Sequence, residues 1–390
     1  MSLTKNGHGA DAKIGLVYVA NLFVSLHFYL VIYVTSAFLG LSFNARDVGI
    51  LYLIGSIASL ALFGGFVGWL KRLGNVRLFS FFLLLEAVAL LCLALAPSVN
   101  VIVAGFLLYA AVSPIIYLNL DIFVERLVRD ERMTGSVRGM FLTMINIAQV
   151  LCPLLAAYLL QESHYGRVYV VSIAFLVVAF TVVFIGLSKF KDATYDRHSL
   201  RKTLAYVIGV PDLFNVFVAQ FLLRFFYAWM VIYTPLYLLS IGFSWAQLGM
   251  MFTIMLLPFL LLEWPLGKIA DWRWGEKEIM VAGFVLMTGS VALLPFLSAQ
   301  FLIWTAVLFV SRIGASCVEI ATESYFFKHV DSSKADTIML FRIARPATYV
   351  AAAAVASGLL FFVSLQWCFV ALALIVALGL RYAVVLKDTK

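Results

Sequence analysis

Apolar runs long enough to cross a bilayer as helices recur almost without interruption along this chain of 390 residues. A membrane-spanning helix needs about 20 consecutive apolar residues. Strands of a membrane barrel are shorter and alternate in polarity, and these runs do not, so the spans are predicted to be helical. The sequence predicts twelve such helices, with the approximate limits 14–40, 48–70, 77–96, 100–124, 137–160, 166–188, 213–239, 246–270, 279–298, 300–327, 337–362 and 365–385.

The composition excludes an ordinary soluble protein. Hydrophobic residues make up 64% of the chain and charged residues only 12%, about half the charged share of a soluble domain. The sequence has neither the His-Glu-x-x-His pattern of zinc enzymes nor the phosphate-binding loop of ATP-driven pumps. The four cysteines lie singly in apolar runs, without the spacing of metal ligands. We therefore predict that the protein is not an enzyme and uses no metal and no cofactor.

Lysine and arginine are distributed unevenly between the two sides of the predicted helices. Alternate loops, the helix ends beside them and both termini hold 22 of the 28 basic residues, while the other side holds two and the helix interiors four. Cytoplasmic loops of membrane proteins are rich in Lys and Arg. Both termini are therefore predicted to be cytoplasmic, in a multi-pass protein of the inner membrane. The net charge of +8 is explained by this topology, and no nucleic-acid partner is expected.

The second half of the sequence resembles the first at an offset of 200 residues. The Val-Ile-Tyr of residues 31–33 returns as residues 231–233, and Phe43 returns as Phe243. A period this long favours one membrane bundle made of two related halves, with a site between them. The predicted parts are an N-terminal six-helix bundle at 1–188, a cytoplasmic loop at 189–212 and a C-terminal six-helix bundle at 213–390.

Residues 267–277 read Gly-Lys-Ile-Ala-Asp-Trp-Arg-Trp-Gly-Glu-Lys, between the eighth and ninth predicted helices. With the two six-helix halves, this stretch resembles the major facilitator superfamily, whose motif A reads Gly-x-Leu-Ala-Asp-Arg-x-Gly-Arg-Lys. The resemblance implies twelve helices and a cluster that latches the cytoplasmic side in the outward-open state. Gly275 is expected to permit the tight turn, and Glu263 is interpreted as part of the same latch. The implied gating residues are Gly267, Asp271, Arg273, Gly275 and Glu263.

The corresponding stretch of the first half, residues 68–77, keeps a glycine and basic residues, but Lys71 stands where the motif has its acid. More of the gating is therefore expected from the Asp271 side. Two other family motifs have weaker copies. Ala148, Cys152, Pro153 and the alanines at 156–157 follow the spacing of motif C, which in the family marks antiporting exporters. The alternative is ordinary packing of small residues in membrane helices.

Arg312, followed by glycine and alanine, resembles the family's motif B, which usually lies in the fourth helix. Arg312, Glu319 and Glu323 fall at about 0°, −20° and +20° around one helix, because each residue advances by about 100°. A charge at mid-bilayer costs about 2.5–3.5 kcal/mol, so this stripe must face a cavity or a partner helix. We predict that Glu319 or Glu323 carries a proton and that Arg312 modulates it, since a nearby arginine favours the ionised carboxylate. Gate salt bridges are the alternative for Glu323, and the same interpretation is given to Asp121 and Glu125.

Polar and aromatic residues on the helices that line the cavity in this family are predicted to form the substrate site. Aromatic residues gather at matching places on the first helix of each half, which suits an amphipathic or aromatic solute. For His27, a polar residue of the core is the alternative to a cavity or proton-carrying role. The candidates are His27, Tyr29, Tyr33, Asn119, Asn146, Gln149, Gln220, Arg224, Tyr227, Tyr233, Arg342 and Arg345.

These observations predict a monomeric secondary transporter in the lipid bilayer that works by alternating access. We expect it to export a small amphipathic molecule in exchange for protons. One alternative is uptake or exchange of an organic anion bound by Arg224, Arg342 and Arg345. The other is a receptor on the same fold that transports nothing.

Overall fold

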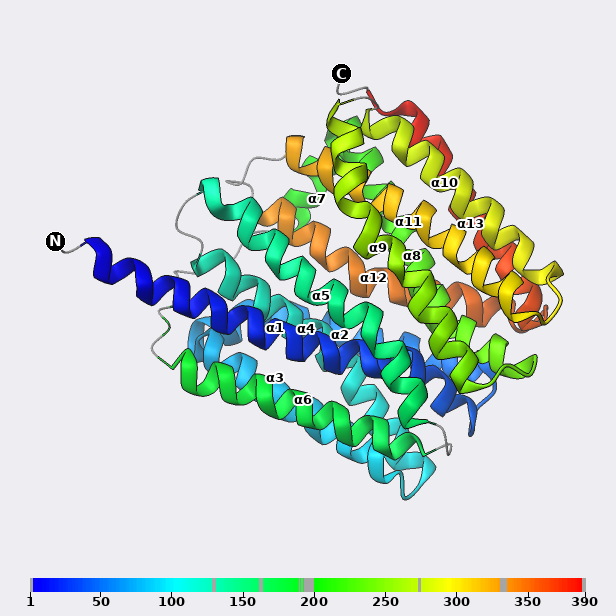
Figure 1. Cartoon of the computed structure of the whole chain (residues 1–390), viewed down its shortest axis with the longest axis horizontal. Helices are drawn as coiled ribbons and strands as arrows, with labels where there is room; N and C mark the ends of the chain where they lie inside the picture. The colour runs from blue at the N-terminus through cyan, green and yellow to red at the C-terminus, as the bar shows by residue number, and fades with distance from the viewer. Residues whose placement is uncertain are drawn as a thin grey trace. The chain divides into compact units, whose positions relative to one another are not determined.

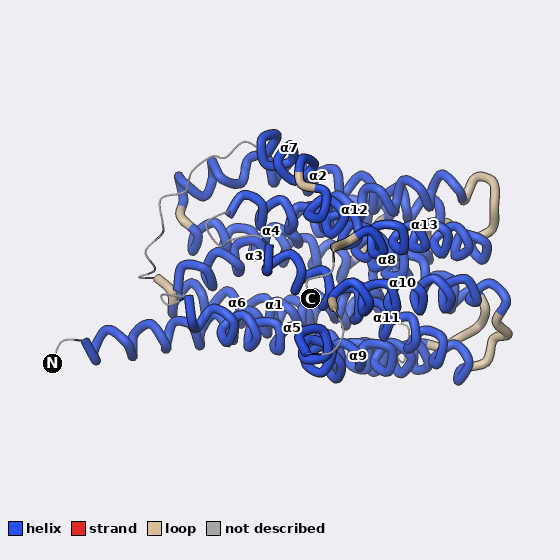
Figure 2. Tube along the Cα trace, turned by 90° about the horizontal axis from the view of Figure 1, so that it is seen from above, coloured by secondary structure: helices blue, strands red, loops and turns tan. Residues whose placement is uncertain are grey.

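The computed structural model describes the backbone of residues 3–127, 131–160, 164–188, 190, 192, 200–272, 275–329 and 335–387. Within these ranges it does not describe the side chains at 3–12, 131–136, 138–139, 200–203, 263–264, 267–272, 327, 329, 335–339 and 341–343. The described chain is made of long helices joined by short loops, and none of it is strand (Figure 2).

All twelve predicted runs correspond to helices (Figure 1). Eleven stretches of the described chain are long and apolar enough to cross a membrane, which supports a multi-pass membrane protein. The helices of the first half are α1 (Leu3–Gly40), α2 (Ala45–Leu73), α3 (Asn75–Leu95), α4 (Val99–Leu127), α5 (Glu131–Leu159) and α6 (Tyr165–Gly186). Those of the second half are α8 (Pro211–Ser240), α9 (Trp245–Trp272), α10 (Glu276–Leu293) with the short 3₁₀ helix η1 (Leu294–Phe296), α11 (Phe301–His329), α12 (Ala335–Leu359) and α13 (Leu365–Val385).

One helix was not expected. The predicted loop at 189–212 contains α7 (Leu200–Gly209), a helix of ten residues. It is too short to cross a bilayer, which requires about 20 residues. Its sequence combines adjacent basic residues with apolar ones, and it ends two residues before the proline that begins α8. The break between the two halves is therefore partly helical.

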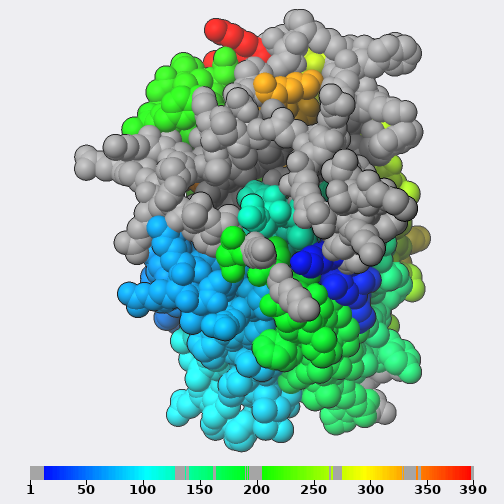
Figure 3. Space-filling model, turned by 90° about the vertical axis from the view of Figure 1, so that its left-hand side faces the viewer, coloured from blue at the N-terminus to red at the C-terminus, as the bar shows by residue number. Residues whose placement is uncertain are grey.

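The chain divides into two compact units, residues 1–42 with 54–197, and residues 43–53 with 198–390. In the first unit, α1 packs against α4, α5 and α6, and α3 packs against α4 and α6. The surfaces of α3 and α6 meet in Figure 3, where α3 is blue and α6 is green. In the second unit, α8 packs against α11, α12 and α13, while α11 also contacts α9 and α10. The predicted boundaries at 188 and 213 stay predictions.

The contact between α10 and α11 depends on two glycines. A Cβ atom on Gly283 would lie 2.7 Å from the backbone oxygen of Gly314, and a Cβ on Gly314 would lie 2.6 Å from the oxygen of Gly283. Membrane helices associate through close packing of small residues rather than through a hydrophobic driving force. The small residues that follow Arg312 therefore have a structural reason: they bring the backbone of α11 against α10.

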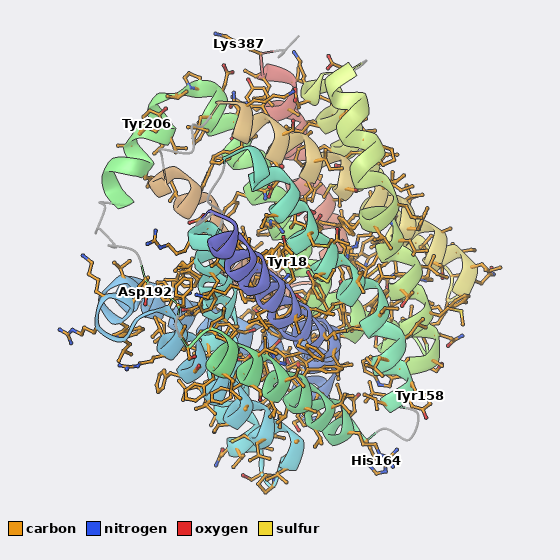
Figure 4. The ribbon with its side chains drawn as sticks, turned by 60° about the vertical axis from the view of Figure 1, so that its left-hand side comes forward. Tyr18, Tyr158, His164, Asp192, Tyr206 and Lys387 are labelled. Atoms are coloured by element: carbon orange, nitrogen blue, oxygen red, sulfur yellow. The ribbon has the colours of Figure 1, made fainter. Side chains whose placement is uncertain are left out.

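The turn between α2 and α3 also requires a glycine. Gly74 has a φ of 75°, in the left-handed region that side chains disfavour. The Asp192 carboxylate lies beside Gly74. It accepts a hydrogen bond of 2.9 Å from the backbone N–H of Asn75, the first residue of α3 (Figure 4). An acid at a helix N-terminus binds the free N–H groups there and opposes the helix dipole. In the stretch 68–77, Lys71 stands where motif A has an acid. Asp192, from the chain after α6, supplies a carboxylate to the turn between α2 and α3.

We expect Asp192→Ala to lower the free energy of unfolding by about 1 kcal/mol, the usual contribution of a helix cap. Asp192→Asn keeps an oxygen acceptor for the Asn75 N–H but removes the charge, so it is expected to lose less. Thermal unfolding of the two purified variants beside the wild type measures both effects. Equal midpoints for the wild type and the alanine variant would show that the cap contributes nothing.

Candidate functional site

Glu319 lies in an ion pair between two helices of the second unit. Arg224 on α8 donates to Glu319 Oε1 on α11 at 2.9 Å. The Tyr227 hydroxyl, one turn further along α8, donates to Glu319 Oε2 at 2.8 Å. Both oxygens of the carboxylate are therefore held by α8. The Arg224 and Glu319 side chains are each 22% exposed, so the pair is neither fully sealed nor freely solvated.

Three further side chains complete this group. Glu323 Oε1 lies 3.9 Å from the same Arg224 nitrogen. The Gln220 amide lies 2.8 Å from Thr322 Oγ1 and 3.1 Å from the Arg224 guanidinium, and its oxygen faces the guanidinium when its nitrogen donates to Thr322. We call these residues the α8–α11 polar cluster. Its members are Gln220, Arg224, Tyr227, Glu319, Thr322 and Glu323.

Arg312 lies on the same side of α11 but has different neighbours. Its guanidinium carbon is 4.8 Å from the centre of the Phe226 ring and 5.7 Å from that of Tyr227. The side chain is only 2% exposed, and its Nε and Nη1 atoms have no hydrogen-bond partner among the described residues. Stacking on aromatic rings stabilises a buried guanidinium by about 2 kcal/mol but supplies no acceptor for its N–H groups.

The three charges predicted to form one stripe thus all face α8. Glu319 is paired with Arg224. Arg312 instead contacts the ring of Tyr227, and the hydroxyl of that tyrosine donates to Glu319. An ion pair between one arginine and one carboxylate thus lies within the membrane span, and a second acid stands beside the same arginine.

The first unit contains a second buried polar group, around His27. Nε2 of His27 on α1 lies 3.0 Å from Glu86 Oε1 on α3, and Nδ1 lies 2.6 Å from the Ser172 hydroxyl on α6. His27, Glu86 and Ser172 are all buried. The second Glu86 oxygen has no hydrogen bond of normal geometry, although the Ser113 hydroxyl lies near the carboxyl group. His27 therefore lies inside the first unit, bonded to two helices, which is the position expected of a polar core residue.

Substitutions of His27 and Glu86 are expected to distinguish the contribution of their hydrogen bond from that of their charges. Glu86→Gln keeps an acceptor for the imidazole and should change the free energy of unfolding by less than about 1 kcal/mol. His27→Leu leaves the carboxyl group without its main partner and should cost about 3 kcal/mol. Thermal unfolding midpoints of the two purified variants check this order. The reverse order would mean that the imidazole, and not the carboxyl group, is the costly group to bury alone.

The other predicted cavity residues have varied surroundings. Asn119 is buried between α3 and α4, where it bonds the Ile115 carbonyl and its own carbonyl accepts from Asn75. Tyr233 is buried with its hydroxyl 3.5 Å from Ser357. Of the remaining candidates, Tyr33 is buried and the others are half-buried: Tyr29, Asn146, Gln149 and Arg345.

The structure describes the surroundings of only some of the predicted gating residues. Asp121 is half-buried and Glu125 exposed near the C-terminal end of α4. Gly275 has a φ of −75° and a ψ of 168°, an extended backbone that any residue adopts. The predicted residues Glu263, Gly267, Asp271, Arg273 and Arg342 lie outside the residues whose side chains the structure describes.

Three acidic residues that make specific contacts in the structure were not predicted from the sequence. Glu276, buried at the start of α10, accepts hydrogen bonds from Ser324 and Lys328 on α11. Glu86 carried a usable signal, because a single acid in the middle of an apolar run is as costly as the acids of α11. Asp192 carried none, since it contacts α3 from 117 residues away.

Comparisons with known proteins agree with this fold. The sequence matches the family model described as Major Facilitator Superfamily over residues 17–345. No curated protein matches it at a significant level. A crystal structure of an auto-inhibited POT family peptide transporter is similar, at 13% identity and a TM-score of 0.74 over 95% of this chain and 96% of that chain. The POT family transporter PepTSo gives 12% identity and a TM-score of 0.76 over 95% and 96% of the two chains.

A third structure, a POT family transporter in complex with a thioalcohol-conjugated peptide, gives 11% identity and a TM-score of 0.75 over 94% of each chain. Identities this low establish a common fold and say nothing about the substrate. The family match covers most of the sequence and identifies a transporter rather than an enzyme. The chain belongs to the major facilitator superfamily.

Proposed function

We propose that this protein is a proton-coupled secondary transporter of a small amphipathic solute, working by alternating access, with Glu319 as the proton-binding group. The observation that carries the proposal is the position of Glu319, held at both oxygens by Arg224 and Tyr227 within a membrane span. An intramembrane carboxylate is costly, and its usual reasons are ion pathways and proton relays.

The cluster supplies a route for coupling. When Glu319 takes a proton, its charge attraction to Arg224 is lost and Arg224 can turn to Glu323, whose carboxylate is 3.9 Å away. Tyr227 then no longer donates to a charged acceptor, and its ring also contacts Arg312. Protonation of one carboxylate therefore changes the partners of two cationic side chains. A ligand shifts a conformational equilibrium only through such differences in contact between states.

For the direction of transport we propose export in exchange for protons. The small residues of α5 support this proposal. Ala148, Cys152 and Ala156 are buried, and the Cys152 thiol lies 3.3 Å from the Leu26 carbonyl of α1. The Tyr18 hydroxyl of α1, labelled in Figure 4, bonds the Val137 carbonyl of α5 at 3.3 Å. This close α1–α5 contact is what the motif C spacing of small residues would produce.

We also propose a monomer in the inner membrane with both termini in the cytoplasm. The alternative of an organic-anion site at Arg224, Arg342 and Arg345 is less well supported, because Arg224 already holds Glu319. Arg345 has contacts of its own. In the part of the chain that the structure describes, a different arginine, Arg312, has buried Nε and Nη1 atoms without a hydrogen-bond partner.

Purified protein in liposomes containing a pH-sensitive dye tests the proposal. Solutes that raise the melting temperature of the protein in a thermal-shift screen are applied as a gradient, since ligands of the folded state stabilise it. Antiport predicts that solute moving out drives protons in, and that an imposed pH gradient drives the solute the other way from the protons. Movement of both in the same direction would refute antiport but keep coupling, and solute movement without protons would refute coupling.

A further inference from the structure

Arg312 is a buried cation with unused hydrogen-bonding capacity at the centre of a membrane span. It lies 11 residues after the start of α11 and 14 before the end of the apolar part of that helix at Phe326. At about 1.5 Å per residue, this places it roughly 17 Å along the helix. Phosphates of the lipid head groups therefore lie too far away to pair with the Arg312 guanidinium.

None of the described acids forms an ion pair with the Arg312 guanidinium. The two acids of the same helix, Glu319 and Glu323, face Arg224. The Phe226 and Tyr227 rings contact the Arg312 guanidinium but offer no lone pair in the plane of its N–H groups. Nε and Nη1 each belong, with Nη2, to one of the two forks through which arginine binds a carboxylate, and both atoms lack a hydrogen-bond partner.

A second unused polar group lies one turn along the same helix. The Ser316 hydroxyl is buried and has no hydrogen-bond partner in the described part of the chain. Four residues advance a helix by about 400°, so Ser316 projects only about 40° from Arg312. Buried polar groups in native proteins nearly always have partners, so two unpartnered groups on one face point to a partner that is not part of the chain.

We infer that Arg312 binds the carboxylate of the transported solute, with Ser316 as a neighbouring hydrogen-bonding group. The inference rests on the proposed function in one respect, that the ligand is the solute being carried. A carboxylate supplies both features that the site lacks, a negative charge and in-plane acceptors. The Phe226 and Tyr227 rings beside the guanidinium favour a carboxylate attached to an aromatic body.

A matched pair of probes tests this site by equilibrium binding to the purified protein, followed by thermal shift. 1-Naphthylacetate has the carboxylate, and 1-naphthylacetamide has nearly the same shape without the charge. We expect the wild type to bind the carboxylate about 10- to 100-fold more tightly than the amide, the usual effect of hydrogen bonds to a charged group. Arg312→Gln should abolish this preference, and Arg312→Lys should keep part of it.

Equal binding of the two probes to the wild type, failure of the wild type to bind either, or an unchanged preference in Arg312→Gln would each overturn the inference. If Arg312→Gln does not fold, Ser316→Ala is tested in its place and should reduce the preference for the carboxylate. The binding assay needs no proton gradient, so it is independent of coupling. A protein that prefers the carboxylate but moves no protons would keep this site and refute the proposed function.

Discussion

Glu319→Gln is expected to reduce solute transport driven by a pH gradient to the leak rate of protein-free liposomes. The amide oxygen can still accept from Arg224 or from Tyr227, but the amide cannot exchange a proton at any accessible pH. Exchange of labelled for unlabelled solute without a gradient should continue, because it does not require proton binding. Dye-reported proton flux and labelled-solute exchange, measured on the same liposomes, distinguish the two effects.

Glu323→Gln is the matched control for this prediction. Glu323 lies one turn from Glu319 on the same face of α11 but stands 3.9 Å from Arg224, where Glu319 stands at 2.9 Å. We expect this variant to lose part of the gradient-driven flux but not all of it, because Glu319 still binds the proton while Arg224 no longer has a second carboxylate to turn to. If Glu319→Gln kept full flux and Glu323→Gln lost it, the proton site would be Glu323. If both variants kept full flux, proton binding by the α8–α11 polar cluster would be excluded.

Gly283→Ala is expected to lower the free energy of unfolding by about 3 kcal/mol, the upper part of the range for overpacking. The added methyl group would lie 2.7 Å from the Gly314 carbonyl oxygen and 2.9 Å from the Cys317 Cβ. A backbone carbonyl cannot rotate away as a flexible side chain can, so the two helices must separate. Separation would also shift α11, which carries Arg312 and Glu319.

Gly289→Ala provides the comparison within the same helix. Gly289 is exposed and a Cβ there meets nothing within 4 Å. Because alanine is a better helix former than glycine, this variant should be stabilised by about 0.5–1 kcal/mol. Thermal unfolding in one detergent gives both values. Equal midpoints for the two variants would show that the α10–α11 contact tolerates a methyl group.

Much of the fold followed from local features. A helix that must cross the bilayer satisfies its own backbone hydrogen bonds, so each run of apolar residues specifies its own element. This is why the twelve predicted runs correspond to twelve long helices, although α1 and α5 begin at Leu3 and Glu131, before the predicted starts at 14 and 137. The angular position of Arg312, Glu319 and Glu323 was equally local, because it depends only on the pitch of one helix.

The partners of those charges did not follow from the sequence. Four intramembrane arginines were candidates for Glu319, and their pairing depends on the rotation of each helix and on the order in which the helices pack. Arg224 proved to be the partner, 95 positions away, while Arg312 was left among aromatic rings. His27 was ambiguous for the same reason, since its bonds to Glu86 and Ser172 span 59 and 145 positions.

The sequence by itself therefore determined the membrane spans, their helical form and the residues that pay an electrostatic cost for lying inside them, because these depend on local composition and helical pitch. Only the tertiary structure decided which of those residues neutralise one another. Glu319 forms an ion pair with Arg224, whereas Arg312 has two N–H groups without a hydrogen-bond partner among the described residues. The physical reason is that an ion pair between helices acts over about 4 Å, a distance set by packing and not by position in the chain.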